Sequence, residues 1–434
     1  MNIILLSGGS GKRLWPLSNE IRSKQFIKLF KNDTNGYESM VQRVYRQIYA
    51  VDPDAKITIA TSNAQVSSLR NQLGVNISIC AEPCRRDTCP AILLAASYLH
   101  DELHVGEEET VAVCPVDPYV DNSYYEAVYA LDSCVQAGTA NLTLMGIEPT
   151  VPSDKYGYII PESPGNISRV KAFKEKPDVE TAKEYLKMGA LWNAGVFACK
   201  LGYLLESANK IAGSADYKEL FTRYGNLEKI SFDYAVAEKE SSIQVMRYSG
   251  KWRDVGTWNM MSEVMSESVK GNVILDEVCE NTHAINELEI PLLCMGCKNM
   301  IVAASSDGIF VADKERSGAM KPYVERISTD IHYAEKSWGT YNMLDMQKGA
   351  VTIKISLYAG RAMSYHSHET RNEVWTVLAG EGVVIVDDME RTVHPGDTVS
   401  ISAGCKHTIL AKTDMQLIEV QVGGVIDVAD KAVF

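Results

Sequence analysis

The chain has 434 residues, of which 46% are hydrophobic and 23% are charged, and its formal net charge is −13. This length allows two or three domains, and the composition is ordinary for a globular enzyme. The acidic excess excludes a general binder of nucleic acid or of acidic membranes, because such proteins need basic residues to neutralise phosphates. A substrate rich in phosphate would therefore require local cations and a divalent metal.

The chain begins with an apolar run, residues 2–6, that predicts a buried strand. This run is too short for a signal peptide, and no apolar run approaches the roughly 20 residues of a membrane span. We therefore expect a cytoplasmic protein without a membrane or nucleic-acid partner. The strand opens into a glycine-rich loop made of Gly8, Gly9, Ser10 and Gly11. Backbone N–H groups of such a loop can approach phosphates closely, so it predicts nucleotide binding.

Two cations follow the loop, Arg13 and Lys24. They supply positive charge that N–H groups alone lack. The glycine spacing matches neither the P-loop pattern nor the dinucleotide-binding fingerprint. The segment therefore indicates a polyphosphate site of another kind.

From residue 1 to about 260, short apolar runs such as 57–61 and 110–114 alternate with helical patterns such as 91–99. This alternation predicts an α/β fold with a mostly parallel, doubly wound sheet. Ligand loops in such a fold follow the carboxyl ends of the strands. We therefore expect Asp117, which comes directly after an apolar run, to lie close to the glycine loop.

Two carboxylates are candidates for a metal site. Asp117 follows Pro115-Val116, and Asp254 lies among aromatic and apolar neighbours in the segment 252–258. Two carboxylates together with triphosphate oxygens suit Mg²⁺, which keeps several waters and seldom uses a full protein cage. The alternative is a pair of unrelated surface aspartates.

Residues 173–177 and 191–197 contain candidates for sugar recognition. Glu175 and Asn193 can bind ring hydroxyls, and Lys176 can bind a sugar phosphate. Taken alone, the first segment would equally fit a solvated charge run.

Together these segments resemble the bifunctional type II mannose-1-phosphate guanylyltransferases, or GDP-mannose pyrophosphorylases, which also carry a mannose-6-phosphate isomerase. The resemblance covers nearly the whole chain and is carried by residues 8–26, 82–88, 115–117, 146–159, 175–177, 192–195, 231–236 and 254–258. It implies catalytic roles for Arg13, Lys24, Asp117 and Asp254, with both aspartates on Mg²⁺. It places Glu82, Arg86 and Asp87 at the nucleotide. It also places Gly157, Glu175, Lys176 and Asn193 at the sugar phosphate.

The resemblance implies that the chain joins mannose 1-phosphate and GTP to give GDP-mannose and pyrophosphate. A phosphomonoester is already anionic near neutral pH, so the attack requires no general base. The family usually has Asn where this chain has Asp87. We expect guanine, but the residues leave another base or another sugar 1-phosphate open, and also a non-catalytic sensor of nucleotide sugars.

Short strand-like pieces from residue 266 to 330 predict a small β extension, and period-two strands from 331 to the end predict an antiparallel barrel. The expected domains are therefore residues 1–265, 266–330 and 331–434.

The ten cysteines form no paired framework. Cys294 and Cys297 form a Cys-x-x-Cys pair, but no second pair accompanies it, so the sequence does not predict a structural zinc site. Free thiols in a reducing cytoplasm are the expected state.

The spacing of His366, His368, Glu373 and His407 among glycines fits the two motifs of cupin barrels. Residues two apart on a strand share a face, so His366 and His368 both point inward. Three imidazoles and a carboxylate suit Zn²⁺, Fe²⁺, Mn²⁺ or Ni²⁺, and we expect Zn²⁺. A metal-free barrel with structural histidines is the alternative.

In the resembled family this barrel is the isomerase. Two departures leave its activity open here: Lys336-Ser337 replaces the usual Arg-Pro, and residues 424–434 contain no Arg. A metal-bearing barrel that is silent or regulatory is the rival. The resemblance also implies a homo-oligomer, a dimer, that acts on small molecules.

Overall fold

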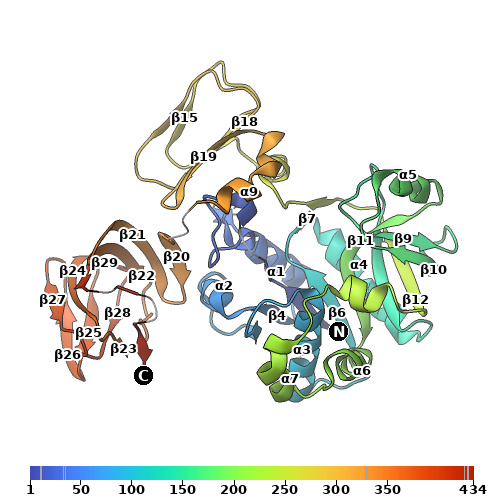
Figure 1. The fold of residues 1–434 in the computed structure, drawn as a ribbon, viewed down its shortest axis with the longest axis horizontal. Helices are drawn as coiled ribbons and strands as arrows, with labels where there is room; N and C mark the ends of the chain where they lie inside the picture. The colour runs from blue at the N-terminus through green and yellow to red at the C-terminus, as the bar shows by residue number, and fades with distance from the viewer. Residues whose placement is uncertain (10–11, 33, 35, 328–330, 425, 428–429) are drawn as a thin grey trace.

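The computed structural model describes the whole chain except residues 10–11, 33, 35, 328–330, 425 and 428–429. Figure 1 shows a large α/β unit on the right, a β extension at the top and a β-barrel on the left. None of the helices in the described ranges combines the length and apolar character that a membrane span needs.

A nine-stranded sheet forms the α/β unit. Its strands, in spatial order, are β5 (Ser78–Glu82), β4 (Lys56–Ser62), β1 (Asn2–Leu6), β6 (Thr110–Pro115), β11 (Leu191–Lys200), β8 (Leu142–Ile147), β12 (Ile243–Tyr248), β10 (Ile167–Lys174) and β9 (Tyr158–Pro161). The pairings place β11 and β10 antiparallel to the other seven. The prediction of a mostly parallel α/β sheet is therefore confirmed.

Helices cover both faces of this sheet, as a doubly wound fold requires. One hydrophobic cluster joins the sheet to α1 (Met40–Val51) and α4 (Asn122–Gln136). A second cluster, on the opposite face, joins it to α3 (Thr88–Asp101), α6 (Leu201–Ala212) and α7 (Tyr217–Arg223). Strand β1 contributes to the cores on both faces of the sheet: Ile3 and Leu5 belong to the first cluster and Ile4 to the second. Side chains alternate along a strand, so an unbroken apolar run is buried on both faces.

The remaining helices are α2 (Val66–Leu73), α5 (Val179–Lys187), α8 (Trp258–Ser262) and α9 (Lys321–Val324). Two short strand pairs, β2 (Phe30–Lys31) with β3 (Tyr37–Glu38) and β7 (Pro118–Val120) with β13 (Trp252–Asp254), lie outside the main sheet. The β7–β13 pair ties residue 254 to the segment after β6.

The β extension is a stack of short parallel strands. One layer contains β14 (Val269–Lys270), β16 (His283–Asn286), β18 (Met300–Ser305) and the antiparallel β19 (Gly308–Asp313); the other contains β15 (Val273–Leu275) and β17 (Leu292–Cys294). Gly271, at φ +85°, lets successive turns approach, because a Cβ there would lie 1.9 Å from the Asn286 carbonyl oxygen.

The C-terminal unit consists of two antiparallel sheets, and the predicted cupin-type barrel is confirmed. The first contains β20 (Tyr333–Lys336), β21 (Gly339–Gln347), β22 (Ala350–Leu357), β29 (Met415–Gly423), β24 (Arg371–Ala379) and β27 (Thr398–Ile401). The second contains β26 (Met389–Val393), β25 (Gly382–Val386), β28 (His407–Ala411), β23 (His366–Ser367) and β30 (Ala432–Val433). Period-two burial along β22 packs alternate side chains into the core between the sheets.

Polar contacts join the three units. Arg22 donates to both carboxylate oxygens of Glu287 in the extension, at 2.6 and 3.0 Å, and its guanidinium lies 4.9 Å from the ring centroid of Tyr333. Asn71 of α2 donates to the carbonyls of Lys336 and Gly339 at 2.7 and 2.9 Å. The boundaries at 265/266 and 330/331 stay predictions, since these contacts describe how the units touch and not where each one ends.

The Glu287→Gln substitution tests the first contact. It leaves the Arg22 side chain, which is 6% exposed, without its counter-charge. We expect a loss of about 3 kcal/mol in unfolding free energy, measured from urea midpoints, since an unpaired buried charge is strongly destabilising. Glu206→Gln is the control, because its pair with Lys210 is 3.7 Å long and both side chains are more than 70% exposed. Equal midpoints for the two variants would contradict the argument.

Candidate functional site

The glycine loop begins where β1 ends. Hydrogen bonds that its backbone carbonyl groups accept from nearby side chains hold it in place. The Gly9 carbonyl accepts hydrogen bonds from Ser23 Oγ at 2.9 Å and Gln65 Nε2 at 3.3 Å. Gly9 has φ +152°, a conformation that a side chain would strain. Gly8 and Gly9 are exposed at the carboxyl edge of the sheet, whereas Ser10 and Gly11 lie outside the described residues.

Strand pairing brings the two predicted aspartates together. Strand β13 runs antiparallel to β7 and places Asp254 directly opposite Pro118, the residue after Asp117. Both aspartates line one cavity of about 220 Å³. The alternative of two unrelated surface aspartates is therefore wrong for this fold, while their metal-binding role stays a prediction.

Two cations flank these carboxylates. Lys24 Nζ lies 2.8 Å from Asp117 Oδ2, and the Arg13 guanidinium reaches within 3.8 Å of the point where a Cβ on Gly256 would stand, next to Asp254. Burial opposes ionisation of Asp117, but Lys24 and Arg13 outweigh it and lower the pKa of that carboxyl. Burial and the neighbouring Asp117 instead raise the pKa of Asp254. This asymmetry marks Asp254 as the carboxylate that lacks a full counter-charge.

The other end of the same cavity carries a polar cluster. Asn193 donates to Asp233 Oδ1 at 2.5 Å, and Lys176 donates to Glu175 Oε1 at 2.7 Å. Gly157 packs tightly here, because a Cβ on it would lie 2.3 Å from Glu175 Oε2. The four residues predicted from the sequence to bind a sugar phosphate thus lie together. Glu175, Lys176 and Asn193 contribute side chains, and Gly157 leaves room for them because it has no side chain.

Two carboxyl groups of this cluster lie in unfavourable surroundings. Glu175 Oε2 is buried and has no hydrogen-bond partner among the described residues. Burial and the neighbouring Glu175 raise the pKa of Asp233 to about 6. Buried carboxylates without partners are rare unless a ligand supplies the donors. The cluster is therefore suited to a ligand rich in hydroxyl groups.

Sequence reasoning did not assign Asp233, Tyr156 or Trp252 to the site, although all three line the cavity. Asp233 begins a short π-helix, Asp233–Ala237, a local irregularity that is frequent at functional sites. The segment 231–236 was already part of the family resemblance. That match was the available signal for Asp233.

The three residues assigned to the nucleotide are not part of the cavity lining. Glu82 lies beneath the glycine loop, 3.9 Å from the position of a Cβ on Gly8, and its buried carboxylate accepts from Tyr224 Oη at 2.6 Å. Arg86 donates to the Gly225 carbonyl. Asp87 caps α3 through the amide of Thr88 at 2.8 Å. These contacts neither support nor exclude nucleotide binding, so the three assignments stay predictions.

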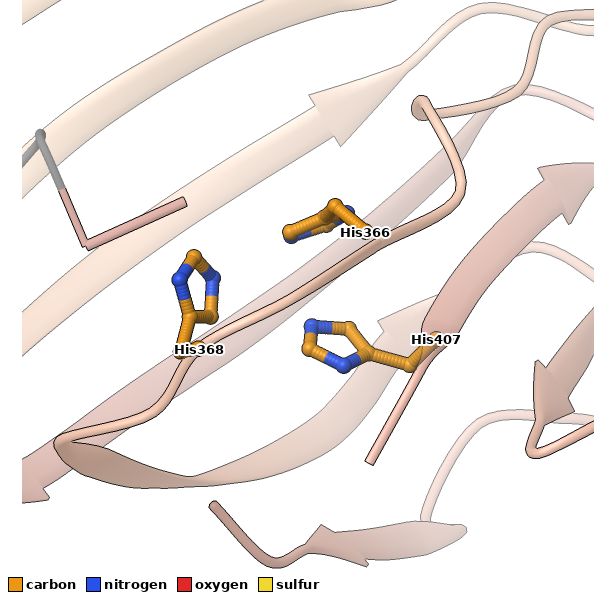
Figure 2. Close-up of side chains that lie close together, drawn as sticks. All are labelled: His366, His368 and His407. Carbon is orange, nitrogen blue, oxygen red and sulfur yellow. The ribbon is translucent and has the colours of Figure 1, made fainter. Parts of the chain in front are cut away.

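The barrel contains a second candidate site. His366 on β23 is paired directly with His407 on β28, and His368 lies two residues further along. Figure 2 shows the three imidazole rings facing one shared space. One ring nitrogen from each lies within 4.8 Å of the others, and all three residues are buried.

Backbone carbonyls orient these rings. The Nδ1 atoms of His366 and His407 lie 2.7 and 2.9 Å from the carbonyl oxygens of Ser364 and Cys405, and Nδ1 of His368 contacts the Asp430 carbonyl. Such carbonyls hold the Nδ1 proton and direct Nε2 inward, the arrangement that metal ligands use. Burial lowers the pKa of His366 to about 3, which keeps its imidazole neutral and able to coordinate.

Glu373 completes the predicted donor set. Its two oxygens lie 3.2 Å from His368 Nε2 and 3.3 Å from His407 Nε2, and it also accepts from Trp375 Nε1 at 3.1 Å. His407 Nε2 is buried without another partner in the described structure. The three inward nitrogens therefore fit a divalent metal, whereas the role of Glu373 as a fourth ligand and the identity of the metal stay predictions.

Asp233→Asn tests the electrostatic strain in the polar cluster at this end of the cavity. A carboxyl whose folded pKa is raised loses native stability as pH rises from its unfolded value near 4 toward 6. We expect the variant to be more stable than the parent at pH 8, by up to about 3 kcal/mol, and equal to it below about pH 4. Urea midpoints across this range measure the difference. A difference that does not vary with pH would contradict the raised pKa.

Comparison with known proteins identifies the family. A model described as nucleotidyl transferase matches residues 2–270, and one described as cupin domain matches residues 354–421. The xanthan biosynthesis protein XanB of Xanthomonas campestris pv. campestris (strain B100) is 30% identical over 456 residues, which cover 97% of this chain and 95% of the relative. A mannose-1-phosphate guanylyltransferase of Escherichia coli (strain K12) is 27% identical over 472 residues, covering 98% and 96%.

Among solved structures, one named mannose-1-phosphate geranyltransferase from Thermus thermophilus is 27% identical, covers 75% of this chain and 98% of its own, and superposes with a TM-score of 0.62. These matches confirm the resemblance read from the sequence motifs. The chain belongs to the nucleotidyl transferase family and carries a cupin domain at its C-terminal end.

Proposed function

We propose that the chain transfers a guanylyl group from GTP to mannose 1-phosphate, giving GDP-mannose and pyrophosphate. The observation that carries this proposal is the cavity that Asp117 and Asp254 line together with the polar cluster of Glu175, Asn193 and Asp233, with Lys24 paired to Asp117. Several full-length relatives are named mannose-1-phosphate guanylyltransferase, which favours this sugar and this base.

In this reaction a phosphate oxygen of the sugar attacks the α-phosphorus in line with the departing pyrophosphate. The nucleophile is already an anion, so the chain needs no general base. We assign Lys24 and Arg13, which lie beside the two aspartates, to the triphosphate, where they would neutralise charge at the α-phosphate. Catalysis would then consist of positioning and electrostatic stabilisation.

Asp117 and Asp254 are the residues that we assign to Mg²⁺. The raised pKa of Asp254 beside Asp117 supports a cation between them, because a bound cation relieves like-charge repulsion. When bound, Mg²⁺ would neutralise phosphate charge and help pyrophosphate to leave.

We assign the polar end of the cavity to mannose 1-phosphate. Glu175 Oε2 is free to accept from a ring hydroxyl, and the Asn193–Asp233 pair offers further polar groups. Lys176 would exchange its bond with Glu175 for the sugar phosphate. We assign Glu82, Arg86 and Asp87, with the loop residues Gly8, Gly9, Ser10 and Gly11, to the nucleotide; the exposed carboxylate of Asp87 could accept from the N–H edge of guanine.

For the barrel we propose mannose-6-phosphate isomerase activity with a bound divalent metal, which we expect to be Zn²⁺. When bound, the metal would polarise a substrate oxygen. Burial and the nearby Glu373 raise the pKa of Glu419, and a carboxyl poised in this way can exchange a proton with substrate. Two lysines are candidates to replace the absent arginines: Lys431 interacts with Glu419 and Glu373, and Lys336 lies close enough to interact with Lys431. Burial lowers the pKa of both lysines.

Pyrophosphate release measured with each NTP and each sugar 1-phosphate tests the transferase. Turnover with GTP and mannose 1-phosphate alone supports the proposal. Turnover with another pair reassigns the substrate, and binding without turnover indicates a sensor. Conversion of mannose 6-phosphate to fructose 6-phosphate tests the barrel in the same preparation. We also expect a homodimer, which light scattering would detect.

Asp117→Asn should lower the rate of pyrophosphate release by about a thousandfold or more, because it removes charge at the proposed metal and leaves Lys24 unpaired. Asp121→Asn is the matched control, since Asp121 is an exposed residue shortly after β7. The unfolding midpoint of each variant shows whether the fold is retained. Near-normal turnover by a folded Asp117→Asn protein would refute the assignment.

His366→Ala should abolish stoichiometric metal in the barrel and leave transferase turnover within about twofold, because the two sites lie in different units. His394→Ala is the control: it lies at a turn, its side chain is 60% exposed, and it is not part of the triad. Elemental analysis of the purified variants gives the metal content. An unchanged content in His366→Ala would exclude the proposed ligands.

A further inference from the structure

In the β extension, two four-residue turns lie one above the other. Both turns carry side chains of the kinds that bind metal ions. Residues 276–279 follow β15, and residues 294–297 overlap the end of β17. The parallel pairing aligns Leu275 with Cys294 and Glu280 with Lys298, so the turns occupy neighbouring rungs of the stack. Each turn has a potential ligand at its first and fourth positions, and the four are Asp276, Cys279, Cys294 and Cys297.

Short contacts join these side chains. Cys279 Sγ accepts a hydrogen bond from the Cys297 amide at 3.4 Å and donates to the Cys294 carbonyl at 3.6 Å. Asp276 Oδ1 accepts from the Gly296 amide at 3.0 Å. The thiol of Cys279 also contacts the Asp276 carboxylate, and the thiols of Cys294 and Cys297 contact each other. All four side chains are therefore gathered at one corner of the extension.

We propose that Asp276, Cys279, Cys294 and Cys297 bind a zinc ion that links the two turns. Three thiolates and one carboxylate form a donor set that favours Zn²⁺ and its tetrahedral geometry. The Cys297 amide, which donates to Cys279 Sγ, stabilises negative charge on a sulfur ligand, as outer-shell hydrogen bonds do in metal sites. Gly296, at φ +62°, allows the tight Cys-Met-Gly-Cys turn that this arrangement needs.

The site is reachable and requires only local adjustment. No three of the four ligand atoms lie within 4.8 Å of one another, so the ion would draw the side chains inward by rotation about their Cα–Cβ bonds. Cys279 and Cys297 are half-buried, and the neighbouring Val278 and Met295 are 60% and 68% exposed. Solvent therefore borders the cluster on one side, and an ion can enter from there.

A physical need for such a link is visible in the core of the extension. One face of the extension, with Ile285, Ile301 and Ala303, packs into the large core of the α/β unit. The other face has a separate cluster with just three buried residues among those described: Ala284, Cys294 and Val302. A small core gives little stability, and small units are commonly reinforced by a metal or by disulfides. A zinc ion would release the thiol protons and convert binding energy into stability of the stacked turns.

Titration of the reduced, metal-depleted full-length protein with Co²⁺ tests the proposal. Thiolate ligands give Co²⁺ a near-ultraviolet charge-transfer band that the histidine site of the barrel cannot produce. We expect one thiolate-bound Co²⁺ per chain, displaced by Zn²⁺. Cys279→Ser and, as a second variant, Asp276→Asn should weaken this binding about tenfold or more. Cys405→Ser, a half-buried thiol in the barrel, is the control and should leave the band unchanged.

Three results would overturn the proposal: no charge-transfer band in the parent protein, a band of equal affinity in both Cys279→Ser and Asp276→Asn, or a Cys279–Cys297 disulfide that persists in the reduced preparation by mass spectrometry. These results are independent of pyrophosphate release. The proposed transferase function and the zinc site can therefore fail separately.

Discussion

Two carboxylates held side by side at the edge of a sheet are the constraint on which the candidate transferase site depends. The β7–β13 pairing places Asp254 opposite Pro118 and therefore beside Asp117. Lys24 neutralises one of them at 2.8 Å, and the other keeps a raised pKa because burial and, to a smaller extent, repulsion from Asp117 oppose its negative charge. A site with this imbalance favours an additional cation, which we propose to be the Mg²⁺ that binds the nucleotide phosphates. The rest of the unit, from the glycine loop to the polar cluster around Glu175, is arranged around that point.

In the barrel, too, strand pairing brings potential metal ligands together, but the residues are different. Pairing of β23 with β28 brings His366 against His407, and Glu373 on the opposite sheet bridges His368 and His407. In both sites, hydrogen bonding between strands creates a concentration of ligand atoms, and nearby carbonyls or cations fix their orientation. The two sites lie in separate units, which are joined by Arg22 against the Tyr333 ring and by the contact of Asn71 in α2 with β20.

Much of this arrangement follows from short-range patterns in the sequence. The unbroken apolar run 2–6 predicts a strand buried on both faces, and the glycines after it predict a loop at the carboxyl edge. The His-x-His spacing predicts two imidazoles on one face of a strand. Other residues gave weak local signals. Asp233 lies 40 residues from Asn193 and touches it only because the π-helix leads back to the cavity.

The cysteines of the extension show the same limit. Cys294 and Cys297 are visible as a pair, but Asp276 and Cys279 join them only through the parallel stacking of two turns. The sequence by itself determined which residues can bind phosphate or metal, and which strands and glycine turns can carry them, because those properties are local. The tertiary structure alone decided which carboxylates, imidazoles and thiols meet, since strand pairing and register set distances between segments that are far apart along the chain.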